Sequence, residues 1–145
     1  MAMKDSTALT ITLGNWDTQQ AQALPLRHAV FVIEQHVPLE LELDEMDAMS
    51  LHALALAGDA AVGTARLLPD GHVGRMAVAA AWRGQGVGSA LLQALIERAR
   101  DLGHAQVVLN AQVHAAGFYA RHGFVQQGGV FDDAGIPHVE MVRRL

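Results

Sequence analysis

Cysteine is absent from this chain of 145 residues, which excludes disulfides, thiolate zinc sites and a cysteine nucleophile. Charged residues make up only 17% of the chain and the net charge is −5, with no run of lysine or arginine, so no nucleic-acid-binding face is expected. The longest apolar runs, such as 51–57, are too short to cross a bilayer. Residues 1–10 lack the apolar stretch of an export signal, so we expect a cytoplasmic protein without a membrane segment.

Hydrophobic residues form 51% of the chain, and no repeat, low-complexity tract or linker divides it, so we expect one domain over residues 1–145. The spacing of apolar residues and turn signals predicts strands at 8–13, 51–57, 60–68, 72–79, 106–111, 124–127 and 138–144. It predicts helices at 21–35, 86–102 and 115–122, with an acidic loop at 36–50. Asp17 or Thr18 can cap the first helix, and Pro25 predicts a break or a late start. This order indicates an α+β or α/β domain with a central mixed sheet.

The most informative segment is Arg83-Gly84-Gln85-Gly86-Val87-Gly88-Ser89, between a predicted strand and the clearest helix. Glycines let the backbone approach a ligand closely. The first turn of a helix adds unpaired N–H groups and the positive end of the helix dipole. Arg83 adds a fixed cation beside them. The segment therefore predicts a pyrophosphate site.

Two other glycine-rich loops fit this segment less well. A P-loop needs a lysine after its last glycine, and none is present. In a dinucleotide fingerprint counted from Gly84, Ser89 occupies the position of the third glycine. Such a fingerprint also opens the first βαβ unit of its fold, whereas this segment follows three apparent antiparallel strands. A helix start with convenient glycines and no ligand is the plain alternative.

Two motifs together make the sequence resemble the GNAT superfamily of N-acetyltransferases. The first, Arg/Gln-x-x-Gly-x-Gly/Ala, is met by Arg83, Gly86 and Gly88. The second is a strand-end Asn followed by Ala-x-x-Phe-Tyr-x-x-x-Gly-Phe, and it is met by Asn110, Ala115, Phe118, Tyr119, Gly123 and Phe124. The segment 30–38, the acidic stretch 42–47, His52 and the segment 135–138 are similar to the small ElaA-like (YjcF-like) branch of that superfamily.

This resemblance implies a GNAT fold, with a mixed, mostly antiparallel sheet flanked by helices and splayed between strands 4 and 5. It implies direct attack of a primary amine, on a small molecule or peptide, on the thioester of bound acetyl-CoA, and it allows a homodimer. The residues that it implies for acetyl-CoA binding are Met76, Ala77, Val78, Arg83, Gly84, Gln85, Gly86, Val87, Gly88, Ser89, Asn110, Phe118 and Tyr119.

Tyr119 is the candidate general acid, because a phenol with a pKa near 10 keeps its proton at neutral pH and can protonate a departing thiolate. The N–H of Val78 is the candidate donor to the thioester oxygen, an interaction worth about 2.7–4 kcal/mol in the transition state. Ordinary aromatic packing of Tyr119 beside Phe118 and ordinary strand pairing of Val78 are the structural alternatives.

The general base is open among several residues. Glu42 and His52 are the first candidates, and Glu34, Asp44, Asp47 and His138 are the others. The stretch 34–47 holds six carboxylates and no lysine or arginine. It predicts either a negative rim that attracts a cationic amine or a solvated acidic face.

Other chemistries find less support. The eight histidines are scattered and no His-x-x-x-His occurs, so no metal is expected. Gly-x-Ser-x-Gly is absent and Ser89 has no base near it in the sequence, which disfavours a serine hydrolase. Two alternatives are kept. Arg27, Val30-Phe31, Glu42, Asp44 and Asp47 are similar to acyl-homoserine-lactone synthases, and a non-catalytic acyl-CoA-binding module would need only the loop.

Overall fold

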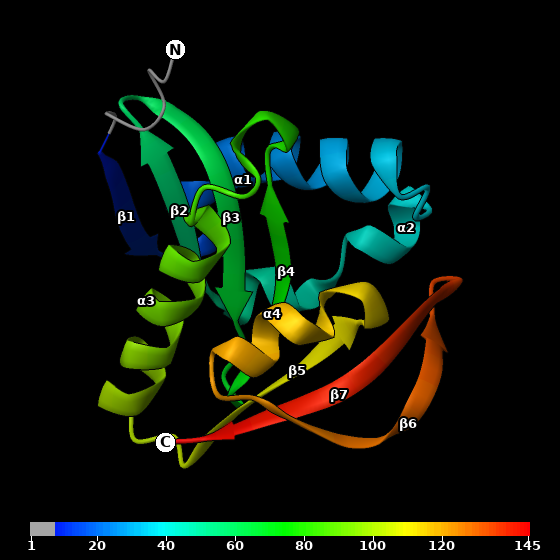
Figure 1. Ribbon diagram of the computed structural model, residues 1–145. Coiled ribbons are helices and arrows are strands. Elements are labelled where there is room, and N and C mark those ends of the chain that lie inside the picture. The colour runs from blue at the N-terminus through cyan, green and yellow to red at the C-terminus, as the bar shows by residue number, and fades with distance from the viewer. Residues whose placement is uncertain (1–7) are drawn as a thin grey trace.

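The computed structural model describes residues 8–145, which form a seven-stranded sheet in the order β1-β2-β3-β4-β5-β7-β6 (Figure 1). The strands are β1 (Leu9–Gly14), β2 (Leu51–Ala57), β3 (Ala60–Leu67), β4 (His72–Val78), β5 (Gln106–Gln112), β6 (Val125–Asp133) and β7 (Ile136–Arg144). Neighbouring strands are antiparallel except β4 and β5, which are parallel. The mixed, mostly antiparallel sheet expected from the sequence is confirmed.

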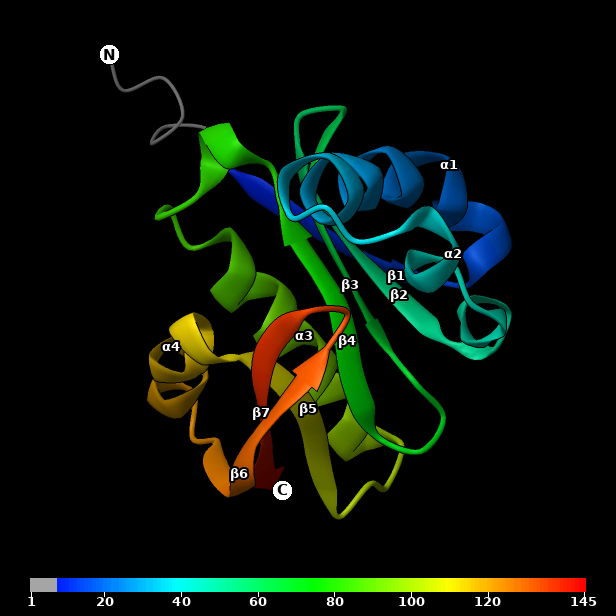
Figure 2. The ribbon, with the colours of Figure 1, turned by 90° about the vertical axis from the view of Figure 1, so that its right-hand side faces the viewer.

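Helices cover both faces of this sheet. They are α1 (Trp16–Arg27), the π-helix η2 (His28–Glu34), α2 (Leu39–Glu42), α3 (Val87–Asp101), α4 (Ala116–Arg121) and the 3₁₀ segments η3 (Glu45–Met49), η4 (Ala80–Trp82) and η5 (Val113–Ala115). Figure 2 shows α1 and α2 on one face and α3 and α4 on the other. Among residues 8–145, no helix is long and apolar enough to span a bilayer.

Helix α3 supplies much of the core through its apolar stripe. Its six buried residues are Val87, Leu91, Leu92, Leu95, Ile96 and Ala99, which recur at helical spacing. The helix lies so close to β3 that a Cβ on Gly63 would stand 2.7 Å from Val87 Cγ1 and 2.9 Å from Leu91 Cδ1. The strand can therefore carry no side chain at that position without moving α3.

The first helix differs from the expectation. Asn15, rather than Asp17 or Thr18, caps it, with its side chain accepting a hydrogen bond from the Thr18 N–H. Pro25 lies inside α1 and does not break it. Proline cannot donate to the carbonyl four residues before it, and the helix widens into η2 shortly afterwards, at His28. Single π-type turns of this kind are frequent at functional sites.

Two further segments are more ordered than the sequence indicated. The expected acidic loop contains α2 and η3. Strand β6 extends to Asp133, because it passes Gly128 and Gly129 with a register shift against β7 and then resumes pairing at Phe131. The hairpin between β2 and β3 at Gly58-Asp59 is confirmed.

Candidate functional site

A cleft opens where β4 and β5 part. The two strands pair only at His72 with Val108 and at Val73 with Leu109, and no further pair joins them within the described residues. A cavity of about 1230 Å³ occupies the gap and reaches both sides of the sheet. Its lining includes β4 from His72 to Val78, the loop before α3, and Asn110, Phe118 and Tyr119. The residues that the sequence predicted for acyl-CoA binding therefore lie largely around one cavity.

The glycine loop adopts a conformation that requires glycine. Gly84 and Gly86 have φ angles of 74° and 85°, in the left-handed region that side chains rarely adopt. Gly86 precedes the first turn of α3, and no side chain caps that helix. A Cβ on either glycine would meet nothing within 4 Å, so the space beside the helix N-terminus is open. Unpaired N–H groups in this turn can bind an anion.

Arg83 is paired with Glu34 at the end of η2. Its Nη1 and Nη2 donate to the two carboxylate oxygens at 2.6 and 2.7 Å, and its Nε donates to the Val78 carbonyl at 3.1 Å. The hydrogen bonds from Arg83 lower the pKa of Glu34. Both side chains are more than 40% exposed, so a phosphate can compete with Glu34 for this guanidinium.

Strand β4 points one of its backbone N–H groups into the cleft. Ala79 N donates to Val62 O on β3 at 2.9 Å, and Val78 lies opposite Gly63 in the next register position. Because the N–H groups of an antiparallel strand alternate in direction, the N–H of Val78 points away from β3, toward the gap. That of Ala77, opposite Thr64, points toward β3. Val78 thus directs a strand N–H into the gap where β5 has already diverged.

Tyr119 lies on α4 and lines the same cavity. Its hydroxyl donates to Met76 Sδ at 3.9 Å, and Phe118 and Phe124 pack against its ring edge to face. Burial raises the pKa of Tyr119 to about 12. The phenol is therefore protonated at physiological pH.

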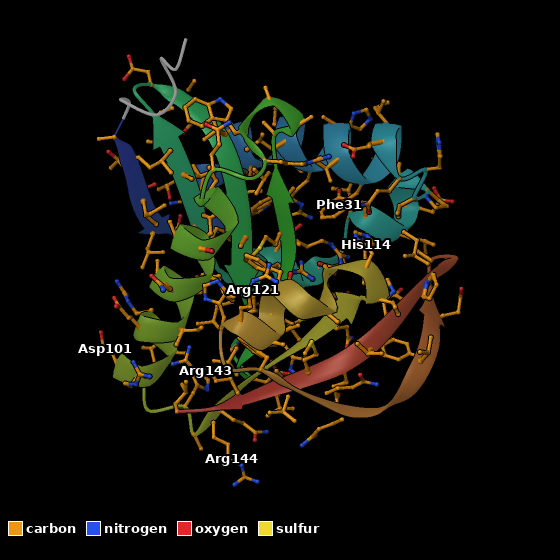
Figure 3. All side chains as sticks on the ribbon, viewed as in Figure 1. Phe31, Asp101, His114, Arg121, Arg143 and Arg144 are labelled. Atoms are coloured by element: carbon orange, nitrogen blue, oxygen red, sulfur yellow. The ribbon has the colours of Figure 1, made fainter. Side chains whose placement is uncertain are left out.

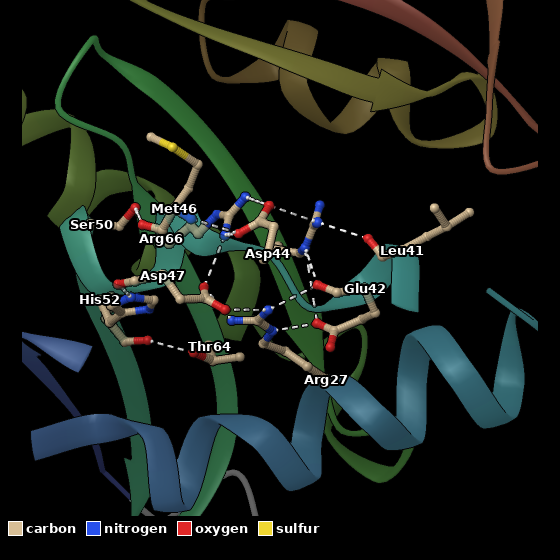
Figure 4. A network of polar contacts seen from close by, with 12 residues as sticks. Arg27, Leu41, Glu42, Asp44, Met46, Asp47, Ser50, His52, Thr64 and Arg66 are labelled. Carbon is tan, nitrogen blue, oxygen red and sulfur yellow. Dashed lines mark hydrogen bonds and ion pairs between the residues drawn. The ribbon is translucent and has the colours of Figure 1, made fainter. Parts of the chain in front are cut away.

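Glu42 and His52 belong to a buried ionic network between α1 and the sheet (Figure 4). Arg27 donates to Glu42 Oε1 at 2.5 Å and to both oxygens of Asp47, at 2.8 and 3.0 Å. Arg66 donates to Asp47 Oδ1 at 2.9 Å and to both oxygens of Asp44, at 2.7 and 2.8 Å. His52 is 1% exposed, and its Nε2 donates to the Asp47 carbonyl at 2.9 Å. Glu42 reaches the cavity lining, whereas His52 does not.

The network changes the interpretation of the acidic stretch. Three of its carboxylates are neutralised by arginines from α1, β3 and β4, since Asp44 also accepts from Arg75 at 3.1 Å. The hydrogen bonds and charge of Arg66 lower the pKa of Asp44 to about 2. Burial would raise the pKa of Asp47, but the hydrogen bonds and charges of Arg27 and Arg66 outweigh it, and the pKa is lowered. The stretch is an ion-paired structural element rather than an unpaired negative rim.

The other end of the cavity is formed by η2, the end of β5 and the β6–β7 turn. Gln35 and Gln112 exchange amide hydrogen bonds of 2.9 and 3.4 Å across it. Phe31 and His114 lie near this end (Figure 3). His138 is 8% exposed, stacks on Phe131 at 6.0 Å and holds the Ile136 carbonyl with Nδ1 at 2.7 Å. A carbonyl only accepts, so Nδ1 carries the proton and Nε2 is left as an acceptor.

One contact had no signal in the sequence. Ser89 has no base near it in the sequence, but in the structure its Oγ lies 2.9 Å from His122 Nε2. The two residues are 33 positions apart, and only the packing of α4 against the start of α3 brings them together. Burial lowers the pKa of His122, and the charges of Arg143 and Arg121 lower it further. Across residues 8–145, no three His, Asp or Glu side chains are grouped to hold a metal.

Known proteins are similar to this chain in sequence and in architecture. A family model described as an acetyltransferase (GNAT) domain matches residues 15–145. YjcF, an uncharacterized N-acetyltransferase of Bacillus subtilis (strain 168), is 39% identical over 131 residues, covering 88% of this chain and 94% of that protein. The structure of an acyl-CoA N-acyltransferase from Pseudomonas aeruginosa matches with a TM-score of 0.84 and 32% identity, covering 94% of this chain and 99% of the other. Escherichia coli ElaA matches with a TM-score of 0.85 and 31% identity, covering 94% and 100%.

Proposed function

Because the chain belongs to the GNAT acetyltransferase family and is an acyl-CoA N-acyltransferase, we propose that it transfers an acetyl group from acetyl-CoA to a primary amine. The carrying observation is that three features line or adjoin one cavity: the glycine loop at the start of α3, the Val78 N–H that points into the gap, and Tyr119. The acceptor is a small molecule or a peptide that enters from the side of η2 and the β6–β7 turn.

The glycine loop would hold the pyrophosphate of acetyl-CoA. Residues 83–89 supply main-chain N–H groups at the N-terminus of α3, and their glycines leave the approach open. The pantetheine arm would lie along Met76, Ala77 and Val78 on one side of the gap, and along Asn110 and Phe118 on the other. Acetyl-CoA supplies an activated carbonyl carbon next to β4.

The reaction needs the stabilisation of one developing negative charge and the transfer of two protons. As the amine nitrogen bonds to the carbonyl carbon, negative charge develops on the thioester oxygen, and we assign its stabilisation to the Val78 N–H, which points into the gap. The carbon–sulfur bond then breaks, and Tyr119 gives its proton to the sulfur. The amine loses its proton to a base. No covalent intermediate with the protein is required.

For the base we propose His138, acting directly or through one water. Its Nε2 has a free lone pair because Nδ1 is held by Ile136, and it lines the cavity. The two residues favoured by the sequence are less available. Glu42 is ion-paired with Arg27, and His52 is buried against Asp47. We propose that both hold the network rather than accept the proton.

The experiment is a measurement of thiol release from acetyl-CoA with a panel of amines. The chain has no cysteine, so a thiol reagent reports CoA without background from the protein. Saturable release that depends on the amine, with the acetylated amine seen by mass spectrometry, is the expected result. Binding of acetyl-CoA without amine-dependent release from any member of the panel would contradict the proposal.

A further inference from the structure

The cavity lining includes a cationic side chain, that of Arg75, which keeps one hydrogen-bond donor for a ligand. Arg75 lies on β4 past the residues paired with β5, at the point where the pairing with β3 shifts by one residue. Its Nε donates to the Glu42 carbonyl at 3.0 Å, and its Nη2 donates to the Leu41 carbonyl at 3.2 Å and to Asp44. Within residues 8–145 its Nη1 makes no hydrogen bond, and the side chain lines the cavity.

The backbone of Arg75 is in an unfavourable conformation. Its φ is 47°, in the left-handed region that residues other than glycine rarely adopt. The preceding residue is Gly74, whose Cβ position faces open space, so nothing fills the hollow beside the arginine. A strained residue that aims a charged group into an open cavity is typical of ligand clamps.

The charges around Arg75 are balanced, because Arg27, Arg66 and Arg75 are ion-paired with three carboxylates, those of Glu42, Asp44 and Asp47. Arg66 lies opposite Gly74 on β3, and its buried Nε has no hydrogen-bond partner in the described part of the chain. The nearest acids are already engaged, since Glu42 is paired with Arg27, and Asp44 with Arg66 and with Arg75 itself. Asp133 is exposed at the rim. What Arg75 offers an anion is therefore its Nη1 donor, and the Asp133 carboxylate at the rim can attract an ammonium group.

We propose that the acceptor amine carries a carboxylate, as an amino acid does, and that Arg75 binds this carboxylate. This inference rests on the proposed function, because it names the acceptor of that reaction. Val78 follows Arg75 by three residues, about 10 Å along an extended strand. An amino acid is much shorter than this separation, so the long side chain of Arg75 has to bring the guanidinium close to the thioester carbon for one small molecule to meet both groups.

Matched substrates test the proposal. The probes are the L-amino acids and the carboxamide of each, with binding followed by thermal shift and turnover by thiol release. At least one amino acid should have a kcat/KM about 10- to 100-fold above that of its carboxamide, the range of a charge-assisted hydrogen bond. The amide has the less basic amine and hence more free nucleophile, so chemistry alone would favour it.

Variants separate this inference from the proposed function. Arg75→Gln should reduce the ratio of carboxylate to amide to about one, mainly through KM for the carboxylate, while rates with the amides stay within a few-fold. Arg75→Lys should retain part of the ratio. Arg98→Gln, which removes a cation from the exposed side of α3, should keep all of it. Thermal melts show whether each variant is folded, and Arg75→Lys decides the case if Arg75→Gln is not.

The outcomes are distinct. If amides and carboxylates bind and react equally, or if Arg75→Gln preserves the ratio, the carboxylate site is refuted while the transferase activity stands. If amino acids stabilise the wild type but not Arg75→Gln, and no amine releases CoA, the carboxylate site stands and the transferase proposal falls.

Discussion

Glu34 and Arg83 are 49 residues apart in sequence and are joined by two hydrogen bonds of 2.6 and 2.7 Å. The pair links the end of η2 to the loop that precedes α3, on the lining of the cleft. In the free protein, Glu34 thus pairs with the guanidinium of Arg83, which the sequence predicted to bind the pyrophosphate. Binding of acetyl-CoA has to share or break this pair.

Removing Glu34 should therefore strengthen acetyl-CoA binding. An exposed ion pair contributes about 0.2–1 kcal/mol, so Glu34→Gln should lower the Kd by up to about 5-fold. Calorimetric titration measures the effect, and Glu97→Gln on the exposed side of α3 is the matched control. A weaker Kd in Glu34→Gln would show instead that the pair builds the binding site.

Tyr119→Phe should lower kcat by about 100-fold or more, because it removes a general acid. The Kd for acetyl-CoA should not change, since the ring and its packing on Phe118 and Phe124 are kept. Stopped-flow or steady-state thiol release gives kcat. Unchanged turnover would mean that the sulfur takes its proton from another source.

The pH dependence of the same reaction carries a second test of Tyr119. Its acid form is needed, and burial raises the pKa to about 12. Loss of the phenol proton should therefore not reduce kcat anywhere between pH 7 and pH 10. A fall centred near pH 10 that disappears in Tyr119→Phe would contradict the buried environment of this hydroxyl.

The ionic network should make stability sensitive to single charge removals. Arg27→Met leaves Glu42 and Asp47 without a buried partner and should lower the free energy of unfolding by about 3–5 kcal/mol. Urea unfolding at pH 7 measures this. Arg98→Met provides the comparison, because it changes an exposed arginine of α3 and should cost little. A loss equal to that of Arg98→Met would show that the network contributes nothing to stability.

Acid should weaken the same network. The folded-state pKa of Asp44 is about 2, below its ordinary value of 3.8, so its contribution is present above pH 3.8 and is lost as the pH falls toward 2. Unfolding experiments in this window should show a smaller slope of stability against pH for Asp44→Asn than for the wild type. Equal slopes would refute the pairing with Arg66.

Much of the fold could be predicted from local signals. The stripe on α3, the Gly58-Asp59 hairpin and the glycine loop each depend on residues close in sequence, and the structure confirms their secondary structure. The contacts of Arg27 with Asp47 and of Ser89 with His122 could not be predicted, because they join distant segments through packing alone. The helix also continued through Pro25, since tertiary packing of α1 outweighs a local preference.

Titration with acetyl-CoA tests the central claim most directly. The wild type should bind with a micromolar Kd, and the Arg83→Ala, Gly86→Ala double variant should lose that binding, because the second change places a side chain at a φ of 85°. The matched control is Arg98→Ala, Gly103→Ala, which removes an exposed arginine and a glycine of φ 87° outside the cleft. It should bind as the wild type does. A folded wild-type protein that does not bind acetyl-CoA, or a loop variant that binds it equally well, would contradict the account.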